Sequence, residues 1–251
     1  MSTGHTRRRL VGGNWKMNHL RADAESYCRV FGDGYRDLTT EVVLFPPATL
    51  LPVTAAGLAG TGVGLGGQDV HPAEKGAHTG DLSAAQLIDA GCGWALCGHS
   101  ERRSDHAESD QLVGHKVAAA TTAGLLPMIC IGETEEERRG GETYAVLDRQ
   151  LGAALASRPT AFAVAYEPVW AIGTGQTATP EIAQEAHAHI RETLADLEGD
   201  EAAGARRVLY GGSVNPENAA DLISRPDIDG FLVGGASLDP ERFLTIIRCC
   251  G

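Results

Sequence analysis

Short, uninterrupted runs of apolar residues recur along the chain, and each one stops at a glycine, a proline or a polar side chain. They occupy residues 10–13, 42–45, 63–67, 94–97, 126–131, 162–165, 208–210 and 231–233. Continuous rather than alternating apolarity is typical of parallel strands that are covered on both faces. The pattern therefore predicts eight buried parallel strands.

Helical segments are expected after these strands, for example over residues 22–38 and in a later segment built on Ala84, Leu87 and Ile88. Eight β-α units in 251 residues fit a closed (β/α)₈ barrel, and a doubly wound sheet is the competing arrangement. No linker or shift in composition divides the chain. We predict one domain over residues 1–251, with about residues 1–8 as a flexible N-terminal extension.

Polar residues and glycines stand just past the ends of several predicted strands. They are Asn14, Lys16, His99, Glu167, Ser213, Gly234 and Gly235. Because the carboxyl ends of parallel strands gather on one face of a barrel, we expect these residues to form one site there.

The stretch around Glu167 is the most informative of these strand ends. An apolar run delivers Glu167 and is followed by Pro168 and a tract rich in Gly and Thr that extends to Ala178. A new helix is expected to begin with Thr179 as N-cap and Pro180 as its first residue. A strand-end carboxylate before a loop of this kind indicates an acid–base site with a movable cover.

Composition narrows the classes of partner. Hydrophobic residues make up 43% of the chain, enough for a sizeable core, and the formal net charge of −12 disfavours nucleic acid and anionic membranes. The six cysteines include no Cys-x-x-Cys pair, and several lie in apolar runs, as Cys97 and Cys130 do. This usage, with no apolar stretch of signal-peptide or membrane-spanning length, leads us to expect a cytoplasmic protein.

Six motifs in order and in register then define a resemblance. They are NWKMN at 14–18, GHSERR at 98–103, CIGET at 130–134, YEPVWAIGTG at 166–175, YGGSV at 210–214 and LVGGASL at 232–238. From about Arg9 to Ile247 the chain resembles the triosephosphate isomerase family. The resemblance implies a TIM barrel that interconverts dihydroxyacetone phosphate and D-glyceraldehyde 3-phosphate through an enediolate, in glycolysis and gluconeogenesis.

The resemblance also implies a role for each catalytic residue. Glu167 matches the catalytic base, and His99 matches a neutral imidazole that donates to the substrate carbonyl. Lys16 would hold the anionic substrate and stabilise developing negative charge, and Asn14 would position the substrate. Glu101 would be a supporting acid, and its ordinary role is an ion pair that orients Lys16.

Phosphate binding is assigned by resemblance to Gly173, Ser213, Gly234 and Gly235. Glycine-rich loops that open helices present backbone N–H groups to phosphate, and Asn215-Pro216 and Ala236-Ser237 are the expected helix starts. Closure of a lid would exclude water from the intermediate. That lid is assigned to Pro168, Val169, Trp170, Ala171, Ile172, Gly173, Thr174, Gly175, Gln176, Thr177 and Ala178.

The segment 68–81 is a long loop with no evident structure of its own, and such loops are usually functional or disordered. In the family this loop enters a second subunit, where the residue matching Thr79 approaches Asn14 and Lys16 of that subunit. A homodimer is therefore implied. His78 departs from the family pattern, in which an aromatic residue such as Phe is usual.

Two other functions are alternatives. The first, a sister isomerase of a four-carbon ketose or aldose phosphate, could keep every motif. The second, a barrel that binds sugar phosphate without turning it over, would predict a damaged base, electrophile or lid, and all three are intact in this sequence. No cofactor is expected, because the base and the electrophile are both protein groups. No metal site is expected, since His187 and His189 do not share a helix face and no zinc-type spacing occurs.

Overall fold

Eight parallel strands close into a barrel in sequence order, so that β1 pairs with both β2 and β8. The computed structural model describes residues 7–36, 38–172 and 178–251. The strands are β1 Leu10–Asn14, β2 Glu41–Phe45, β3 Gly64–Gly67, β4 Trp94–Cys97, β5 Leu126–Ile131, β6 Ala163–Tyr166, β7 Arg207–Tyr210 and β8 Gly230–Val233. The prediction of a single (β/α)₈ barrel is confirmed, and the doubly wound alternative is wrong.

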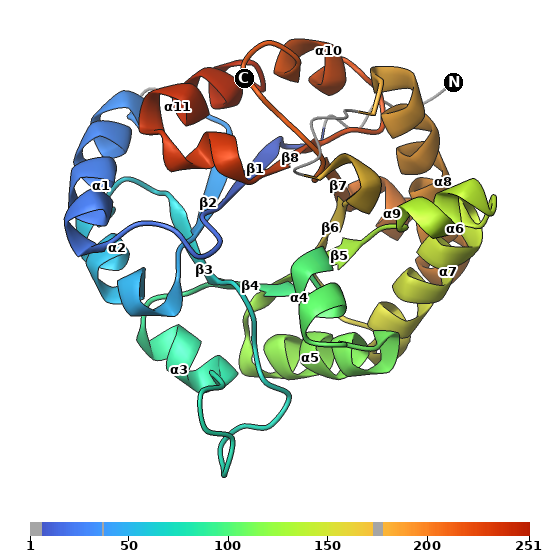
Figure 1. Ribbon diagram of the computed structural model, residues 1–251, viewed down its shortest axis with the longest axis horizontal. Helices are drawn as coiled ribbons and strands as arrows, with labels where there is room; N and C mark the ends of the chain where they lie inside the picture. Colours follow the sequence, from blue (N-terminus) through green and yellow to red (C-terminus); the bar gives the residue numbers. More distant parts are fainter. Residues whose placement is uncertain (1–6, 37, 173–177) are drawn as a thin grey trace.

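Helices form the outer ring around this barrel (Figure 1). Its α-helices are α1 Arg21–Tyr35, α2 Leu51–Gly57, α3 Ala84–Asp89, α4 Ser100–Asp105, α5 Asp110–Ala123, α6 Glu135–Arg139, α7 Thr143–Ala154, α8 Pro180–Glu198, α9 Asp200–Ala205, α10 Ala219–Ile223 and α11 Pro240–Arg248. Short 3₁₀ turns are η1 Ala48–Leu50, η2 Leu155–Ser157, η3 Val169–Ala171 and η4 Gly235–Leu238. Among the described residues, no helix combines the length and apolarity needed to cross a bilayer.

The core has two layers because every strand is buried on both faces. One cluster fills the barrel interior and includes Phe45, Met128 and Leu209, while the larger one lies between the strands and the helices. Gly66 makes room for the interior layer, since a Cβ there would lie 2.3 Å from the ring of Phe45. This double burial explains why the strands appeared as continuous apolar runs.

The helix signals had mixed outcomes. Thr179 caps α8 by accepting the N–H of Ile182, and Pro180 is the first helical residue, as predicted. Helix α1 ends at Tyr35 and is shorter than the predicted segment. Asn215-Pro216 does not start a helix: the Asn215 side chain accepts the N–H groups of the next turn, and α10 begins only at Ala219.

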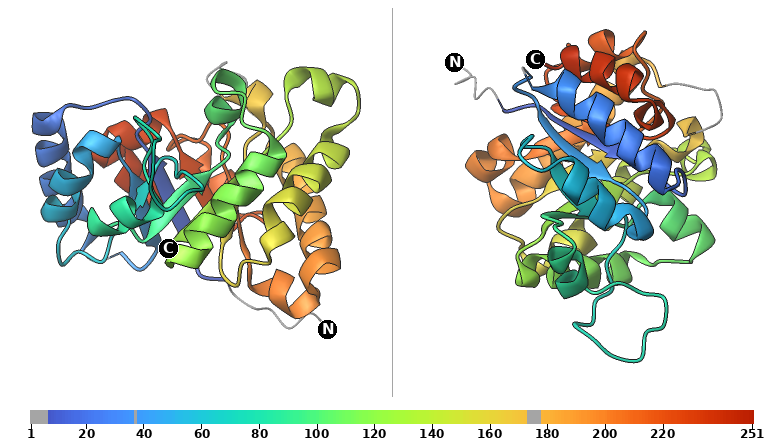
Figure 2. Two further views of the ribbon diagram at one scale, coloured as in Figure 1. Left: turned by 90° about the horizontal axis from the view of Figure 1, so that it is seen from below. Right: turned by 90° about the vertical axis from the view of Figure 1, so that its left-hand side faces the viewer.

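The N-terminal end of the described chain is bound to the barrel through Arg7. Within the predicted N-terminal extension, Arg7 Nε lies 2.5 Å from Oδ1 of buried Asp229. Residues 1–6 of that extension are outside the described residues. Figure 1 and the right-hand view of Figure 2 show that the segment between β3 and α3 projects from the body of the barrel.

Candidate active site

A cavity of about 460 Å³ opens at the carboxyl ends of the strands. Its lining includes most of the residues predicted for the site, namely Asn14, Lys16, His99, Glu167, Ser213, Gly234 and Gly235. Ile172 from the predicted lid and Arg242 from α11 complete part of its wall. The strand-end residues are therefore brought together on one face, as the sequence predicted.

Glu167 follows β6 directly and is almost fully buried, with 2% exposure. Its backbone N–H donates to the carbonyl of Ile131 at 2.7 Å, which continues the barrel ladder by one residue. Its carboxylate accepts the N–H of Ser100 at 2.9 Å and lies 3.1 Å from Nε2 of His99. A buried carboxylate held by two donors in a cavity is well placed for proton transfer.

His99 is the N-cap of α4, and its ring orientation follows from that position. Its Nδ1 accepts the N–H of Glu101 at 3.2 Å, so the neutral ring carries its proton on Nε2. That Nε2–H faces Glu167 inside the cavity. The geometry agrees with the expectation of a neutral imidazole that can donate to a substrate oxygen.

Lys16 is held in place from three sides. Its ammonium lies 2.6 Å from Glu101, its N–H donates to the Asn14 side chain at 3.0 Å, and its carbonyl accepts from Gln68 at 2.8 Å. Its φ of 50° is unusual for a residue with a side chain, so these contacts stabilise a strained backbone. The expected ion pair between Glu101 and Lys16 is present.

Gln68 was not predicted as a site residue. Besides the Lys16 carbonyl, its amide also donates to the carbonyl of Phe45 at 2.9 Å. It thereby ties the loop after β3 to the ends of β1 and β2. A glutamine just past the third apolar run was the available signal, but nothing in its spacing pointed to Lys16.

The glycine-rich loops that follow β7 and β8 both lie at the cavity. Gly211, Gly212 and Ser213 line the cavity with Gly234 and Gly235, and η4 begins at Gly235. The expected helix start at Ala236-Ser237 is thus a 3₁₀ turn that begins one residue earlier. Gly173, the phosphate residue assigned from the lid, is outside the described residues.

The first part of the predicted lid is anchored by a buried acid that the sequence did not assign. Glu133, fully buried, accepts the indole N–H of Trp170 at 2.8 Å and the hydroxyl of Tyr166 at 3.1 Å. The Arg138 guanidinium stacks 4.1 Å from the Trp170 ring centroid. Burial, together with the nearby Glu133 charge, raises the pKa of Tyr166 well above its usual value, so its hydroxyl stays a donor.

The described part of the lid comprises Pro168, η3 and Ile172 on one side and buried Ala178 on the other. Residues 173–177, assigned as the tip and the start of the second hinge, are outside the described residues. The lid assignment therefore stays a prediction for them.

Below the site, Lys116 of α5 is buried at 3% exposure between two carboxylates. Its ammonium lies 2.6 Å from Asp69 and 2.5 Å from Glu108, and Arg102 also pairs with both acids. Burial raises the pKa of Asp69 in spite of Lys116. At Glu108 burial acts in the same direction, but hydrogen bonds from Lys116 and Arg102 outweigh it and lower the pKa.

The projecting loop carries the residues assigned to a subunit contact. His78 and Thr79 are both exposed near its tip. Contrary to the expectation of a loop without internal structure, His71 forms a parallel bridge with Ser83 and closes the neck. His71, His78 and Asp81 also form a cluster of potential metal ligands that the sequence did not predict.

Comparison with known proteins agrees with this geometry. The family model described as triosephosphate isomerase matches residues 9–250. The chain is 52% identical over 247 residues to a protein of Xanthobacter flavus named triosephosphate isomerase, covering 98% of each chain. Proteins of the same name from Bordetella pertussis and Thermus thermophilus are 49% and 46% identical over 249 residues, covering 98% of this chain and 99% and 100% of theirs.

Proposed function

The chain belongs to the triosephosphate isomerase family, and we propose that Glu167, His99 and Lys16 carry its reaction in the cavity described above. The activity is the interconversion of dihydroxyacetone phosphate and D-glyceraldehyde 3-phosphate, an aldose–ketose isomerisation of glycolysis and gluconeogenesis. The four-carbon alternative is not favoured, because relatives at about half identity over nearly the full length are named for the triose substrate.

The observation that carries the proposal is the contact between Glu167 and His99 in one buried pocket, 3.1 Å apart. Glu167 would take a proton from C1 of dihydroxyacetone phosphate, and the bonding electrons would move onto the carbonyl oxygen. His99 Nε2–H would give its proton to that oxygen and take up the proton of the C1 hydroxyl, and the proton held by Glu167 would then return at C2 to form the aldehyde. Both carboxylate oxygens of Glu167 are engaged with donors, so one must exchange its partner for substrate before reaction.

Lys16 and Asn14 would stabilise the enediolate oxygens, and Glu101 would keep the Lys16 ammonium oriented. The phosphate would lie against the backbone of residues 211–213 and 234–235, opposite Glu167 in the same cavity. Gly173 and the rest of the lid would cover it. This chemistry uses protein groups only, and a non-catalytic sugar-phosphate barrel would not need a buried base facing an imidazole donor.

The test is Glu167→Gln, which keeps the hydrogen-bonding size of the side chain but removes the base. Turnover with D-glyceraldehyde 3-phosphate is expected to fall by at least about 10²–10⁴-fold, the usual contribution of a general base, while a non-reacting triose phosphate analogue still binds. Near-normal activity would exclude Glu167 from its role. Turnover of four-carbon ketose phosphates alone would refute the triose assignment.

We also propose a homodimer formed through the projecting loop. Met17, next to Lys16, is 96% exposed, and Leu20 nearby is 75% exposed, so two large apolar side chains lie open close to a residue that lines the cavity. Exposed apolar patches of this kind favour a protein contact. The loop tip with His78 and Thr79 of a second copy would cover it.

We propose a cytoplasmic location and a small phosphorylated sugar as the ligand. All six cysteines are free, which suits a reducing compartment. The net charge of −12 gives nucleic acid and anionic membranes no general attraction.

A further inference from the structure

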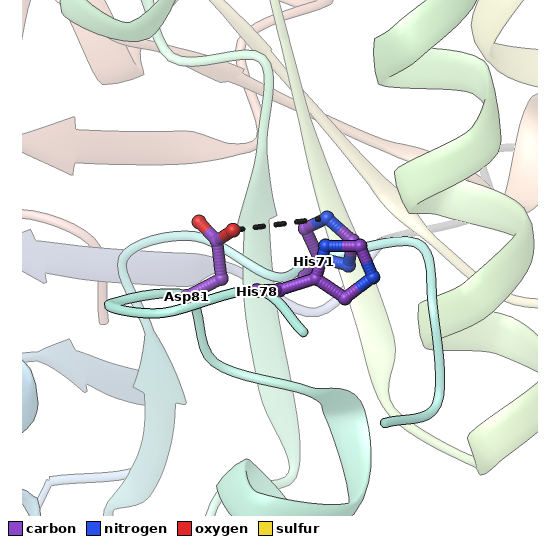
Figure 3. Close-up of side chains that lie close together, drawn as sticks. All are labelled: His71, His78 and Asp81. Carbon is purple, nitrogen blue, oxygen red and sulfur yellow. Dashed lines mark ion pairs between the residues drawn. The ribbon is translucent and has the colours of Figure 1, made fainter. Parts of the chain in front are cut away.

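Two imidazoles and a carboxylate come together on the projecting loop (Figure 3), and none of the three lines the cavity of its own chain. His71 Nε2 lies 3.7 Å from Asp81 Oδ2, and the ring centroids of His71 and His78 are 4.0 Å apart. One potential ligand atom from each of the three residues lies within 4.8 Å of the other two. We propose that His71, His78 and Asp81 bind one transition-metal dication of the Zn²⁺ type.

The loop backbone holds the three side chains together. At the neck, the His71 N–H donates to the carbonyl of Leu82 at 2.8 Å. At the tip, the His78 N–H donates to Gly76 and the Asp81 N–H donates to the carbonyl of His78 at 3.1 Å. These hydrogen bonds hold the neck and the tip of the loop in a fixed conformation. Binding a metal therefore costs little conformational entropy.

The spacing suits tetrahedral coordination after a small adjustment. Zn²⁺ binds nitrogen and carboxylate oxygen at about 2.0–2.2 Å, which puts neighbouring ligand atoms roughly 3.3–3.6 Å apart. The separation of 3.7 Å between His71 and Asp81 is already close to this value. The His78 ring already lies against His71 within the same loop, with the centroids 4.0 Å apart, so a rotation of its side chain closes the remaining distance without moving the loop tip away from a second copy, and one water can take the fourth position.

Binding also predicts a change at His71. Its Nδ1 accepts the N–H of Ala73 at 3.0 Å, so the neutral ring carries its proton on Nε2, facing Asp81. A metal at Nε2 takes the place of that proton. The proton then resides on Nδ1, the Ala73 N–H turns to solvent, and the ring stays neutral.

The donor set selects the class of metal. Two imidazole nitrogens and one carboxylate suit Zn²⁺, Co²⁺, Ni²⁺ or Cu²⁺, whereas Mg²⁺ and Ca²⁺ prefer oxygen ligands throughout. Among the described residues, His71 is the only ionic partner of Asp81. The carboxylate is therefore available to a cation without breaking a stronger pair.

The experiment is calorimetric titration of the full-length protein, in its native assembly, with Zn²⁺. We expect one ion per chain. His71→Gln, His78→Phe and Asp81→Asn are each expected to weaken binding at least about 100-fold, because even outer-sphere partners of a metal site are worth about 10–100-fold. His78→Phe keeps an aromatic ring against His71. His115→Gln, at an exposed histidine of α5, is the matched control and should bind as the wild type does.

Absorption spectra with Co²⁺ identify the ligands. A four-coordinate spectrum without thiolate charge-transfer bands supports the site. Thiolate bands would place the metal at a cysteine such as Cys249, which is partly exposed, and would overturn the proposal. It would also be overturned by no binding up to millimolar Zn²⁺, or by wild-type affinity in the His78 and Asp81 variants. Metal-free melting curves of all variants establish that the loop changes leave the fold intact.

Discussion

At the scale of single residues, the position of the Glu167 side chain depends on a glycine in the neighbouring strand end. A Cβ added at Gly211 would lie 2.9 Å from Glu167 Cγ and 3.1 Å from the Tyr166 carbonyl. Gly211→Ala is therefore expected to displace the base and lower kcat by about 10–100-fold, since a misplacement of about 1 Å can cost this much.

Steady-state kinetics measures the effect, with thermal unfolding to separate it from loss of the fold. Gly152→Ala in α7 is the control, because an added Cβ there meets no atom within 4 Å. The control should keep its kcat. An unchanged kcat in Gly211→Ala would show that the base does not need this space.

His187 makes stability depend on pH. Its ring is fully buried, and burial lowers its pKa from 6.5 to about 4, although the Asp227 carbonyl 3.2 Å from Nδ1 acts in the opposite direction. Because the pKa of His187 is lower in the folded state than in the unfolded chain, the folded state keeps its full stability above about pH 6.5. Its free energy of unfolding then decreases as the pH falls from 6.5 towards 4. The reason is that the His187 side chain binds a proton in the unfolded chain in this pH range but not in the folded protein, which stabilises the unfolded state.

Between pH 7 and pH 5 the wild type should lose about 2 kcal/mol more unfolding free energy than His187→Gln, which cannot titrate. Denaturant titrations of both proteins at the two pH values measure this difference. Comparing the two proteins cancels the other histidines and the carboxylates. Equal losses in the two proteins would mean that His187 is not kept neutral by the fold.

At the scale of elements, the ion cluster around Lys116 joins the loop after β3 to α4 and α5. Lys116→Met should destabilise the protein by roughly 3–5 kcal/mol, because it leaves Glu108 and Asp69 without their shared buried cation. Arg149→Met is the control: its exposed pair with Asp110 should be worth less than about 1 kcal/mol. Denaturant unfolding compares the two, and similar losses would contradict the assignment.

Strands were easier to predict from this sequence than the starts of helices. Residues 94–97 and 126–131 were predicted as strands and are β4 and β5, because burial on both faces imposes an apolar residue at every position. Helix α10 starts late because side-chain hydrogen bonds of Asn215 stabilise a turn, and propensity alone does not reveal that competition.

Within the site, the residues at strand ends were predictable because a parallel barrel brings those ends together. The residues that support them from other elements could not be predicted in this way. Lys116 stands among apolar residues of α5, and only the fold shows that Glu108 and Asp69 meet it there. The approach of His71 and His78 depends on the backbone of one loop, which no periodicity encodes.

At the scale of the whole molecule, the open apolar surface at Met17 predicts self-association. The wild type should have the mass of a dimer in solution, and Met17→Glu should shift it towards monomer by placing a charge in the buried contact. Turnover should fall with it, because Met17 directly follows Lys16 and the loop tip of the second copy would no longer lie against this part of the site.

Leu197→Glu is the control, since Leu197 is also an exposed apolar residue, on α8. It should leave both mass and turnover unchanged, because we place no partner on that helix. Light scattering and sedimentation at the concentrations used for kinetics give the mass directly. A wild-type monomer with full activity would exclude the dimer. A Met17→Glu protein that stays dimeric would instead place the interface away from this surface, and the projecting loop would then need another role.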